Sequence, residues 1–186
     1  IKFDSKKNIK KNLHLKFLGP EPLEDKFNFK YFNNYIIGRN RNIKDLLMDQ
    51  KFVSGLGNIY VNEVLFMSNV KPTKKVYKLL KKDIEKILFS VKKILLKAIK
   101  LGGSSIRDFS SSSGKSGSFQ EHFNVYGKQG DLCSNSDCKS KIKKIIISNR
   151  ASFFALVVKN NKVDRYIADI YTVLKICRIQ NQQLEE

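Results

Sequence analysis

The stretch MDQKFVSGLGNIY, residues 48–60, decides the fold of this 186-residue chain. Gly55 and Gly57 permit a tight turn, and Asn58 suits the N-cap of a helix over residues 59–66. Free backbone N–H groups and the helix dipole at such a start can bind one phosphate, and Lys51 and Asn58 would add side-chain donors. The pattern also occurs as an ordinary tight turn, and Tyr60 stands where a dinucleotide fingerprint needs its third glycine.

Around this stretch the periodicity of apolar residues predicts a mainly α fold. Short helices are expected over residues 29–37 and 43–48, and a long one over residues 80–99, where apolar residues recur every three or four positions until Gly102-Gly103 ends the helix. Residues 142–154 are rich in β-forming side chains and predict a hairpin. The expected architecture is a helical domain followed by a small β-hairpin unit.

Two segments interrupt these elements. Pro20 and Pro22 stiffen residues 18–23 and disfavour helix before them, which suits a linker between domains. Residues 110–118 are almost entirely serine and glycine, so a loop is expected there. We therefore place boundaries near residue 18 and on either side of the serine-rich loop.

The charge of the chain indicates a polyanionic partner. The formal net charge is +19 and the isoelectric point is near 9.8. Residues 155–186 hold five basic and four acidic side chains, so residues 1–154 carry +18 of that total. Nucleic acid is the first candidate partner and a membrane surface the second. Because no apolar run approaches the ~20 residues of a membrane span, and no signal peptide is recognisable, we expect a cytoplasmic protein.

The cysteines and histidines give a weaker signal. Three cysteines, an odd number, argue against a disulfide framework and leave metal ligation or idle thiols. His14 and His122 are isolated, so neither is expected in a metal or catalytic cluster.

Several motifs in one order make residues 18–154 resemble the formamidopyrimidine-DNA glycosylases and the related endonuclease VIII-like enzymes. The motifs are the linker LGPEPL, the turn quoted above, Gly102-Gly103 with Asp108-Phe109, Gly114-Lys115 with Gly117, and Val125-Tyr126-Gly127. The resemblance implies a helix–two-turn–helix domain and a zinc finger. It also implies an enzyme of base-excision DNA repair that flips an oxidised purine out of duplex DNA, removes it and nicks the abasic site.

Carried over to this sequence, the resemblance implies a set of DNA-binding residues on the turn and the hairpin: Lys51, Gly57, Asn58 and Arg150. Asn58 would bind phosphate, and Arg150 would hold the phosphates that flank the lesion. A flexible loop over residues 110–120 would close over the flipped base with Gly114, Lys115, Gly117 and Phe119. The partner would be double-stranded DNA with an oxidised purine or an abasic site. The protein would be a monomer in the bacterial cytoplasm, associated with the nucleoid and not with a membrane.

The domain plan that follows has five parts. Residues 1–17 would be a remnant of the β-rich catalytic domain, 18–109 the helix–two-turn–helix domain, 110–120 the capping loop, 121–154 an incomplete zinc-finger-like hairpin, and 155–186 a tail foreign to the family. The family's nucleophile is an amino-terminal proline followed by glutamate, whereas this chain starts at Ile1. We therefore expect no catalytic residue in it, and expect the chain to be an inactive carboxy-terminal fragment that still binds DNA.

Zinc is the second departure from the family pattern. The family binds zinc with two Cys-x-x-Cys pairs, but here Cys133 and Cys138 form one wider pair and the second pair is missing after Phe154. We expect weak zinc binding or none. A one-base frameshift at Phe154 would explain the loss, because the alternative frame permits Cys-Ser-Ser-Cys-Gln-Lys and a stop. On this hypothesis residues 155–186 are an out-of-frame translation; the alternative is an authentic tail.

Two other functions stay open at this point. A non-catalytic nucleic-acid-binding module would use the same turn and the same arginine, Arg150. A basic ribosome-associated or membrane-surface protein is supported by the charge alone.

Overall fold

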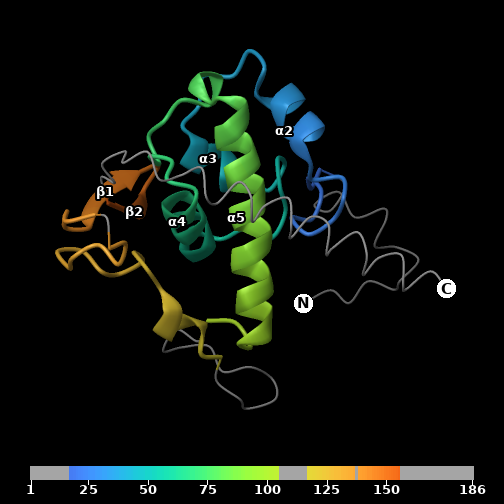
Figure 1. Cartoon of the computed structure of the whole chain (residues 1–186). Helices are drawn as coiled ribbons and strands as arrows, with labels where there is room; N and C mark the ends of the chain where they lie inside the picture. Colours follow the sequence, from blue (N-terminus) through green and yellow to red (C-terminus); the bar gives the residue numbers. More distant parts are fainter. Residues whose placement is uncertain (1–16, 105–116, 137, 156–186) are drawn as a thin grey trace.

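The computed structural model describes residues 17–104, 117–136 and 138–155. The helical elements in this part of the chain are α2 (Phe29–Ile36), α3 (Ile43–Leu47), α4 (Asn58–Met67), the 3-10 turn η2 (Val76–Lys78), α5 (Lys81–Lys100) and the 3-10 turn η3 (Phe119–His122). Two strands follow, β1 (Lys143–Ile147) and β2 (Arg150–Phe154). The expected fold class, mainly helical with a small antiparallel hairpin, is confirmed (Figure 1).

The long helix α5 is the centre of the helical part. Its apolar stripe is buried against the other helices, as the spacing predicted, at Ile84, Ile87, Val91, Ile94 and Ala98. Its first turn is capped by Asp83, whose carboxylate accepts a hydrogen bond from the Leu80 N–H at 2.9 Å. Its end is closed by Gly102 and Gly103, both at positive φ, with the Gly103 N–H donating to Ala98 O at 2.8 Å.

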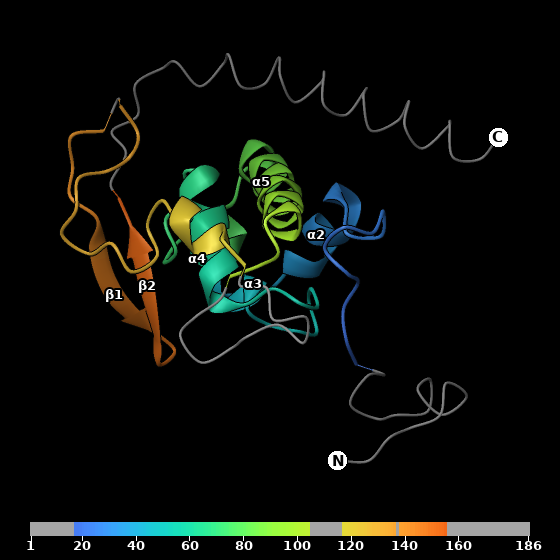
Figure 2. The ribbon, with the colours of Figure 1, turned by 90° about the horizontal axis from the view of Figure 1, so that it is seen from below.

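The shorter helices surround α5 and enclose one apolar core. Phe27, Phe32 and Phe52 are at most 1% exposed. The ring of Phe52 meets the other two edge to face, with the centroids of Phe32 and Phe52 5.0 Å apart. Seen from below, the hairpin, α4, α5 and α2 lie in that order across the molecule (Figure 2). The hairpin and α2 are therefore on opposite sides of α4 and α5.

The start of the proline-containing segment packs against the turn over residues 48–57, which we call the glycine turn. The Gly19 N–H donates to Gln50 O at 2.8 Å, and the Ser54 N–H donates to Pro20 O at 3.1 Å. Pro22 is buried. The domain boundary placed near residue 18 stays a prediction, but residues 19 and 20 are fixed to the helical part by backbone hydrogen bonds.

The hairpin is antiparallel, with Ile147 paired to Arg150 across a two-residue turn. The turn residues Ser148 and Asn149 both have positive φ, 47° and 60°, as a type I′ turn requires. A small apolar cluster lies behind the hairpin and its preceding loop, made of Val125, Cys138, Ile142, Phe153 and Ala155. We call residues 123–155 the hairpin unit.

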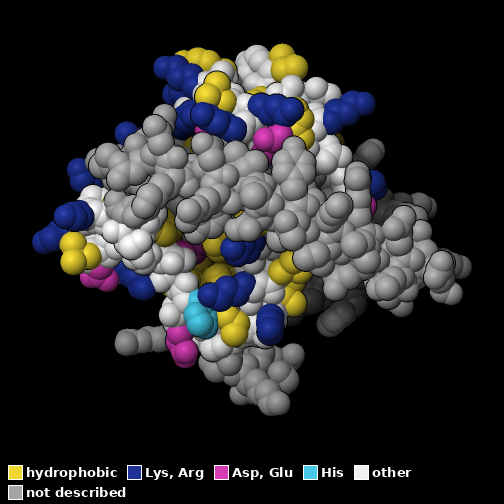
Figure 3. All heavy atoms as spheres, in the orientation of Figure 1, with side chains coloured by type: hydrophobic (Ala, Val, Ile, Leu, Met, Phe, Trp, Pro, Cys, Tyr) yellow, Lys and Arg dark blue, Asp and Glu magenta, His cyan; other side chains and the backbone are white. Residues whose placement is uncertain are grey.

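Basic side chains outnumber acidic ones on the face that Figure 3 shows. Figure 3 shows Lys and Arg side chains spread over the visible face, with few acidic side chains among them. No helix in the described ranges is both long and apolar enough to cross a bilayer.

Candidate nucleic-acid interface

The glycine turn is shaped by Gln50, a residue that the sequence analysis did not select. Its Oε1 accepts the Gly55 N–H at 2.8 Å, and its Nε2 donates to Leu56 O at 3.1 Å. Phe52, Val53 and Leu56 point into the core and are at most 1% exposed. The turn is therefore anchored from beneath by apolar side chains and closed by one amide, which leaves Lys51 exposed at its surface.

The start of α4 corrects one detail of the sequence prediction. Gly57 is the N-cap, with φ −103° and ψ 171°, and Asn58 is the first helical residue. Among the described residues, none accepts a hydrogen bond from the N–H groups of Asn58, Ile59 or Tyr60. Nothing lies within 4 Å of the space that a Gly57 side chain would occupy. The helix thus presents unpaired donors beside an open backbone, which is a favourable arrangement for an anion.

A carboxylate braces the other side of the turn. Asp49 accepts a hydrogen bond from Arg41 Nη1 at 2.6 Å and another from the Lys51 N–H at 3.0 Å. Partial burial raises the pKa of Asp49, but the two hydrogen bonds together with the positive charges of Arg41 and Lys51 outweigh this effect and hold the pKa below its usual range. Asp49 therefore stays charged and fixes the backbone next to Lys51.

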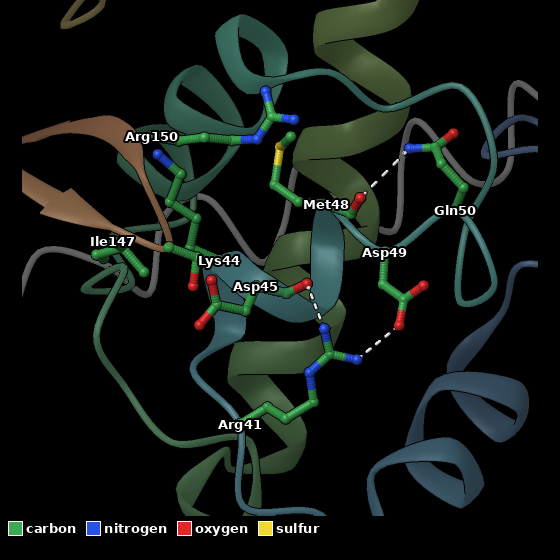
Figure 4. Close-up of a pocket in the computed structure, with 9 residues that line it drawn as sticks. Arg41, Lys44, Asp45, Met48, Asp49, Gln50, Ile147 and Arg150 are labelled. Carbon is green, nitrogen blue, oxygen red and sulfur yellow. Dashed lines mark hydrogen bonds and ion pairs between the residues drawn. The ribbon is translucent and has the colours of Figure 1, made fainter.

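Arg150 stands at the tip of the hairpin, on the first residue of β2, and is exposed. It borders a pocket of about 480 Å³ between the hairpin and α3 (Figure 4). Met48, Asp49 and Gln50 of the glycine turn border the same pocket. The tertiary structure thus brings the predicted hairpin arginine to the predicted turn, although about 100 residues separate them in the sequence.

The hairpin strand is held to α3 by a buried lysine. Lys44 is 1% exposed, and its Nζ donates to Ala151 O and to Ser152 Oγ, both at 2.6 Å. Burial lowers the pKa of Lys44 to about 8, Asp45 opposes this shift, and the charge of Arg150 adds to it.

A buried glutamate holds the start of the hairpin unit. Glu63 is fully buried in α4, and its two oxygens accept the N–H groups of Asn124, Val125 and Tyr126 at 2.8–3.0 Å. The Asn124 side chain donates a fourth hydrogen bond at 3.0 Å. These bonds explain structurally why Asn124-Val125-Tyr126-Gly127 forms a fixed loop at this point.

The predicted capping residues divide into two groups. Gly114 and Lys115 lie outside the described residues. Gly117 packs against the end of α5, where a side chain would come within 2.3 Å of Gly103 O. Phe119 is 1% exposed and packs on Tyr60 with ring centroids 5.6 Å apart. Phe119 is therefore a core residue at the end of the loop, and its role in capping stays a prediction.

The two cysteines of the hairpin unit lie in one small loop. Cys138 is buried and its Sγ is 2.9 Å from Ser140 Oγ. Burial, together with the neighbouring Cys138 thiol, raises the pKa of Cys133.

The family's zinc does not fit the described residues. Within the described ranges, no three His, Cys, Asp or Glu side chains are grouped so that they could hold a metal ion. The third cysteine, Cys177, lies outside them, as does His14, while His122 is exposed in η3. That Cys133 and Cys138 supply two of the four ligands of a closed zinc site stays a prediction.

The sequence analysis missed four residues that organise this region: Gln50, Lys44, Asn62 and Glu63. A signal existed for three of them, because Lys44, Asn62 and Glu63 stand beside buried apolar residues in short helices. A polar residue in such a position needs a partner. The sequence could not say which partner.

Comparison with known proteins identifies the helical part. A family model, described as the formamidopyrimidine-DNA glycosylase H2TH domain, matches residues 18–110, which is half of the chain. A formamidopyrimidine-DNA glycosylase of Roseobacter denitrificans is 41% identical over 140 residues, covering 75% of this chain and 50% of the relative. The enzyme of Bdellovibrio bacteriovorus is 41% identical over 152 residues, covering 82% of this chain and 56% of its own.

Solved structures agree with this assignment. The Lactococcus lactis protein in complex with DNA containing an abasic site superposes with a TM-score of 0.74 at 38% identity, over 82% of this chain and 55% of that one. The Thermus thermophilus protein gives a TM-score of 0.73 at 30% identity, over 79% of this chain and 56% of that one. The chain thus spans about half the length of the relatives it matches. It belongs to the formamidopyrimidine-DNA glycosylase family.

Proposed function

We propose that this chain binds damaged duplex DNA, containing an oxidised purine or an abasic site, in base-excision repair. The observation that carries the proposal is the meeting of two donor sets from distant segments. One set is the open start of α4 with Asn58 and the neighbouring Lys51; the other is Arg150 at the hairpin tip. Met48, Asp49 and Gln50, at the beginning of the turn, border one pocket with Arg150. Asn62 hydrogen bonds both Asn58 and Ala151, the residue after Arg150, so the two donor sets are linked through α4.

The two donor sets suit phosphates rather than bases. Unpaired backbone N–H groups, a side-chain amide and a guanidinium all donate hydrogen bonds to phosphate oxygens. The net charge of +19 adds long-range attraction to any polyanion. We therefore expect these residues to position a duplex without reading its sequence.

The relatives support duplex DNA as the partner. Lactococcus lactis structures of this family hold DNA with an abasic site or with a Fapy-dG lesion. The glycosylase and lyase steps are proposed for a polypeptide that also carries the family's catalytic proline. The present chain, which spans about half of such a polypeptide, would contribute DNA binding to that activity.

Fluorescence anisotropy with an abasic-analogue duplex and a matched undamaged duplex tests the proposal. Arg150→Ala should weaken binding to both by about tenfold or more, the usual effect of losing a charged hydrogen bond, and should reduce the salt slope by about one. Asn58→Ala should weaken binding without changing the slope, because the side chain is neutral.

Arg39→Ala is the matched control. Arg39 is an exposed arginine beyond the end of α2 that stacks on the Tyr35 ring, 4.0 Å from its centroid, and it is not among the residues that border the pocket with Arg150. Its loss removes one positive charge and should change affinity little. If Arg39→Ala and Arg150→Ala weakened binding equally, or if heparin and anionic vesicles competed as well as DNA, a non-specific polyanion-binding protein would replace the proposal.

A further inference from the structure

Asn62 is a buried amide in the middle of the apolar helix α4. It is 1% exposed, and its side chain forms hydrogen bonds both to Asn58 in the same helix and to the hairpin strand. Its Nδ2 donates to Asn58 O at 2.7 Å, to Asn58 Oδ1 at 3.3 Å and to Ala151 O at 3.4 Å. Its Oδ1 accepts the Phe153 N–H at 2.7 Å. One side chain thus contacts both segments that supply the proposed phosphate donors.

The bond to Asn58 orients that residue's amide. An amide group has its acceptor oxygen and its donor nitrogen on opposite sides. Because Asn62 holds the Asn58 oxygen, the Asn58 nitrogen is turned away from Asn62. None of the described residues accepts a hydrogen bond from this nitrogen. The donor end of Asn58 is therefore available to a phosphate at the start of α4.

The bonds to β2 fix the hairpin. Asn62 binds the strand at Ala151 and Phe153, and Lys44 binds it at Ala151 and Ser152. Three consecutive residues that follow Arg150 are thus held to α3 and α4. Arg150 is the first residue of β2 and directly precedes these three anchored residues. A shift of the strand along α4 would therefore move Arg150 with it.

We propose that Asn62 is a positioning residue that sets the distance between Asn58 and Arg150, so that the two bind the DNA backbone as one unit. The inference rests on the proposed function, since it assumes that both residues bind phosphate. Two phosphate contacts held at a fixed separation strengthen each other, because the first contact places the second phosphate within reach of its ligand. Loss of one contact should therefore reduce the contribution of the other to DNA affinity.

A double-mutant cycle on DNA affinity tests this. In the 186-residue chain, Asn58→Ala and Arg150→Ala together should cost less than the product of their separate fold-losses, by at least about threefold, as for other coupled neighbours. In an Asn62→Ala background the two losses should multiply. Thermal unfolding and circular dichroism of each variant confirm that it is folded. If Asn62→Ala does not fold, Asn62→Ser replaces it, since a serine at this position can bond Asn58 O but does not span to Phe153.

Ser68→Ala is the matched control. Ser68 is 3% exposed at the other end of α4, and its hydroxyl donates to Leu65 O at 3.2 Å. Its loss should lower the stability of the chain but leave the coupling between Asn58 and Arg150 unchanged. If Ser68→Ala also abolished the coupling, a general destabilisation of α4 would be the cause. The inference is overturned if the coupling between Asn58→Ala and Arg150→Ala persists in the Asn62→Ala background. It is also overturned if that coupling is absent from the chain with Asn62 intact. In both cases the proposed DNA binding still stands. If neither Asn58→Ala nor Arg150→Ala weakens binding, the proposed function itself fails.

Discussion

The helical part and the hairpin unit are stabilised in different ways, although each supplies donors for the proposed interface. The helical part encloses one cluster of twenty buried apolar residues among the described residues, and the hairpin unit has a cluster of five. The hairpin unit compensates with directional bonds. Lys44, Asn62 and Glu63, all buried side chains of the helical part, bind its backbone.

This difference has a physical reason. A unit of about 33 residues buries too little apolar surface to be stable alone, and small units usually need a metal, a disulfide or a partner surface. An apolar contact also tolerates sliding, whereas a hydrogen bond fixes direction and register. The polar anchors therefore determine where Arg150 lies, while the apolar core determines whether the helical part folds.

Restoring a second cysteine pair should have the largest effect on the hairpin unit. A variant in which Phe154 is followed by Cys-Ser-Ser-Cys-Gln-Lys and a stop should bind about one zinc per chain, with an apparent folding contribution of order 10 kcal/mol. The 186-residue chain should bind zinc weakly or not at all. Metal analysis after dialysis against a chelator measures both. Stoichiometric, chelator-resistant zinc in the 186-residue chain would refute the prediction and the frameshift hypothesis with it.

Truncation of a side chain in the apolar core should strongly destabilise the helical part. Phe52 is fully buried and contacts the rings of Phe27 and Phe32. Phe52→Ala should lower the free energy of unfolding by about 3–5 kcal/mol. Denaturant titration measures it, with Ile146→Ala on the exposed side of β1 as a control expected within about 0.5 kcal/mol. Similar losses for the two variants would mean that the core is not the main source of stability.

Removal of a polar anchor should act on the hairpin unit alone. Glu63→Ala leaves the N–H groups of Asn124, Val125 and Tyr126 without their acceptor. We expect a loss of about 2–3 kcal/mol, seen by hydrogen exchange as faster exchange in residues 124–126 and in β2. Protection of α5 should be unchanged. Faster exchange throughout α5 would show that the two regions unfold together.

The Lys44 anchor should show the smallest effect, as a dependence on pH. Its pKa is about 8 in the folded state and 10.5 when unperturbed, so the unfolded chain binds more protons between these values. The contribution of Lys44 to stability should therefore rise with pH through this window and be lost as pH falls through 8. Relative to Lys44→Met, the chain should gain about 2 kcal/mol between pH 7 and 9.5. A stability difference that is independent of pH would mean that the ammonium is not desolvated.

The helices were predictable because they depend on local patterns. The apolar spacing of residues 80–99 and the two following glycines predicted α5, and the structure shows it as Lys81–Lys100 with the expected glycine ending. The start of α4 was one residue off, because the backbone of Gly57 takes the capping position and Asn58 turns its side chain to Asn62. Caps depend on contacts beyond the helix, so the ends were less certain than the middle.

By itself the sequence determined the helical class, the turn before α4, the hairpin and the basic surface, since each follows from periodicity, glycine placement or charge within a short window. Tertiary structure alone decided that Phe119 is buried, that Gly117 packs on Gly103, and that Lys44, Asn62 and Glu63 anchor the hairpin unit. The partners of these three side chains in the hairpin unit lie 61 to 108 residues away. A buried polar residue shows in the sequence that it needs a partner, but only the folded chain brings a particular backbone group within hydrogen-bonding distance.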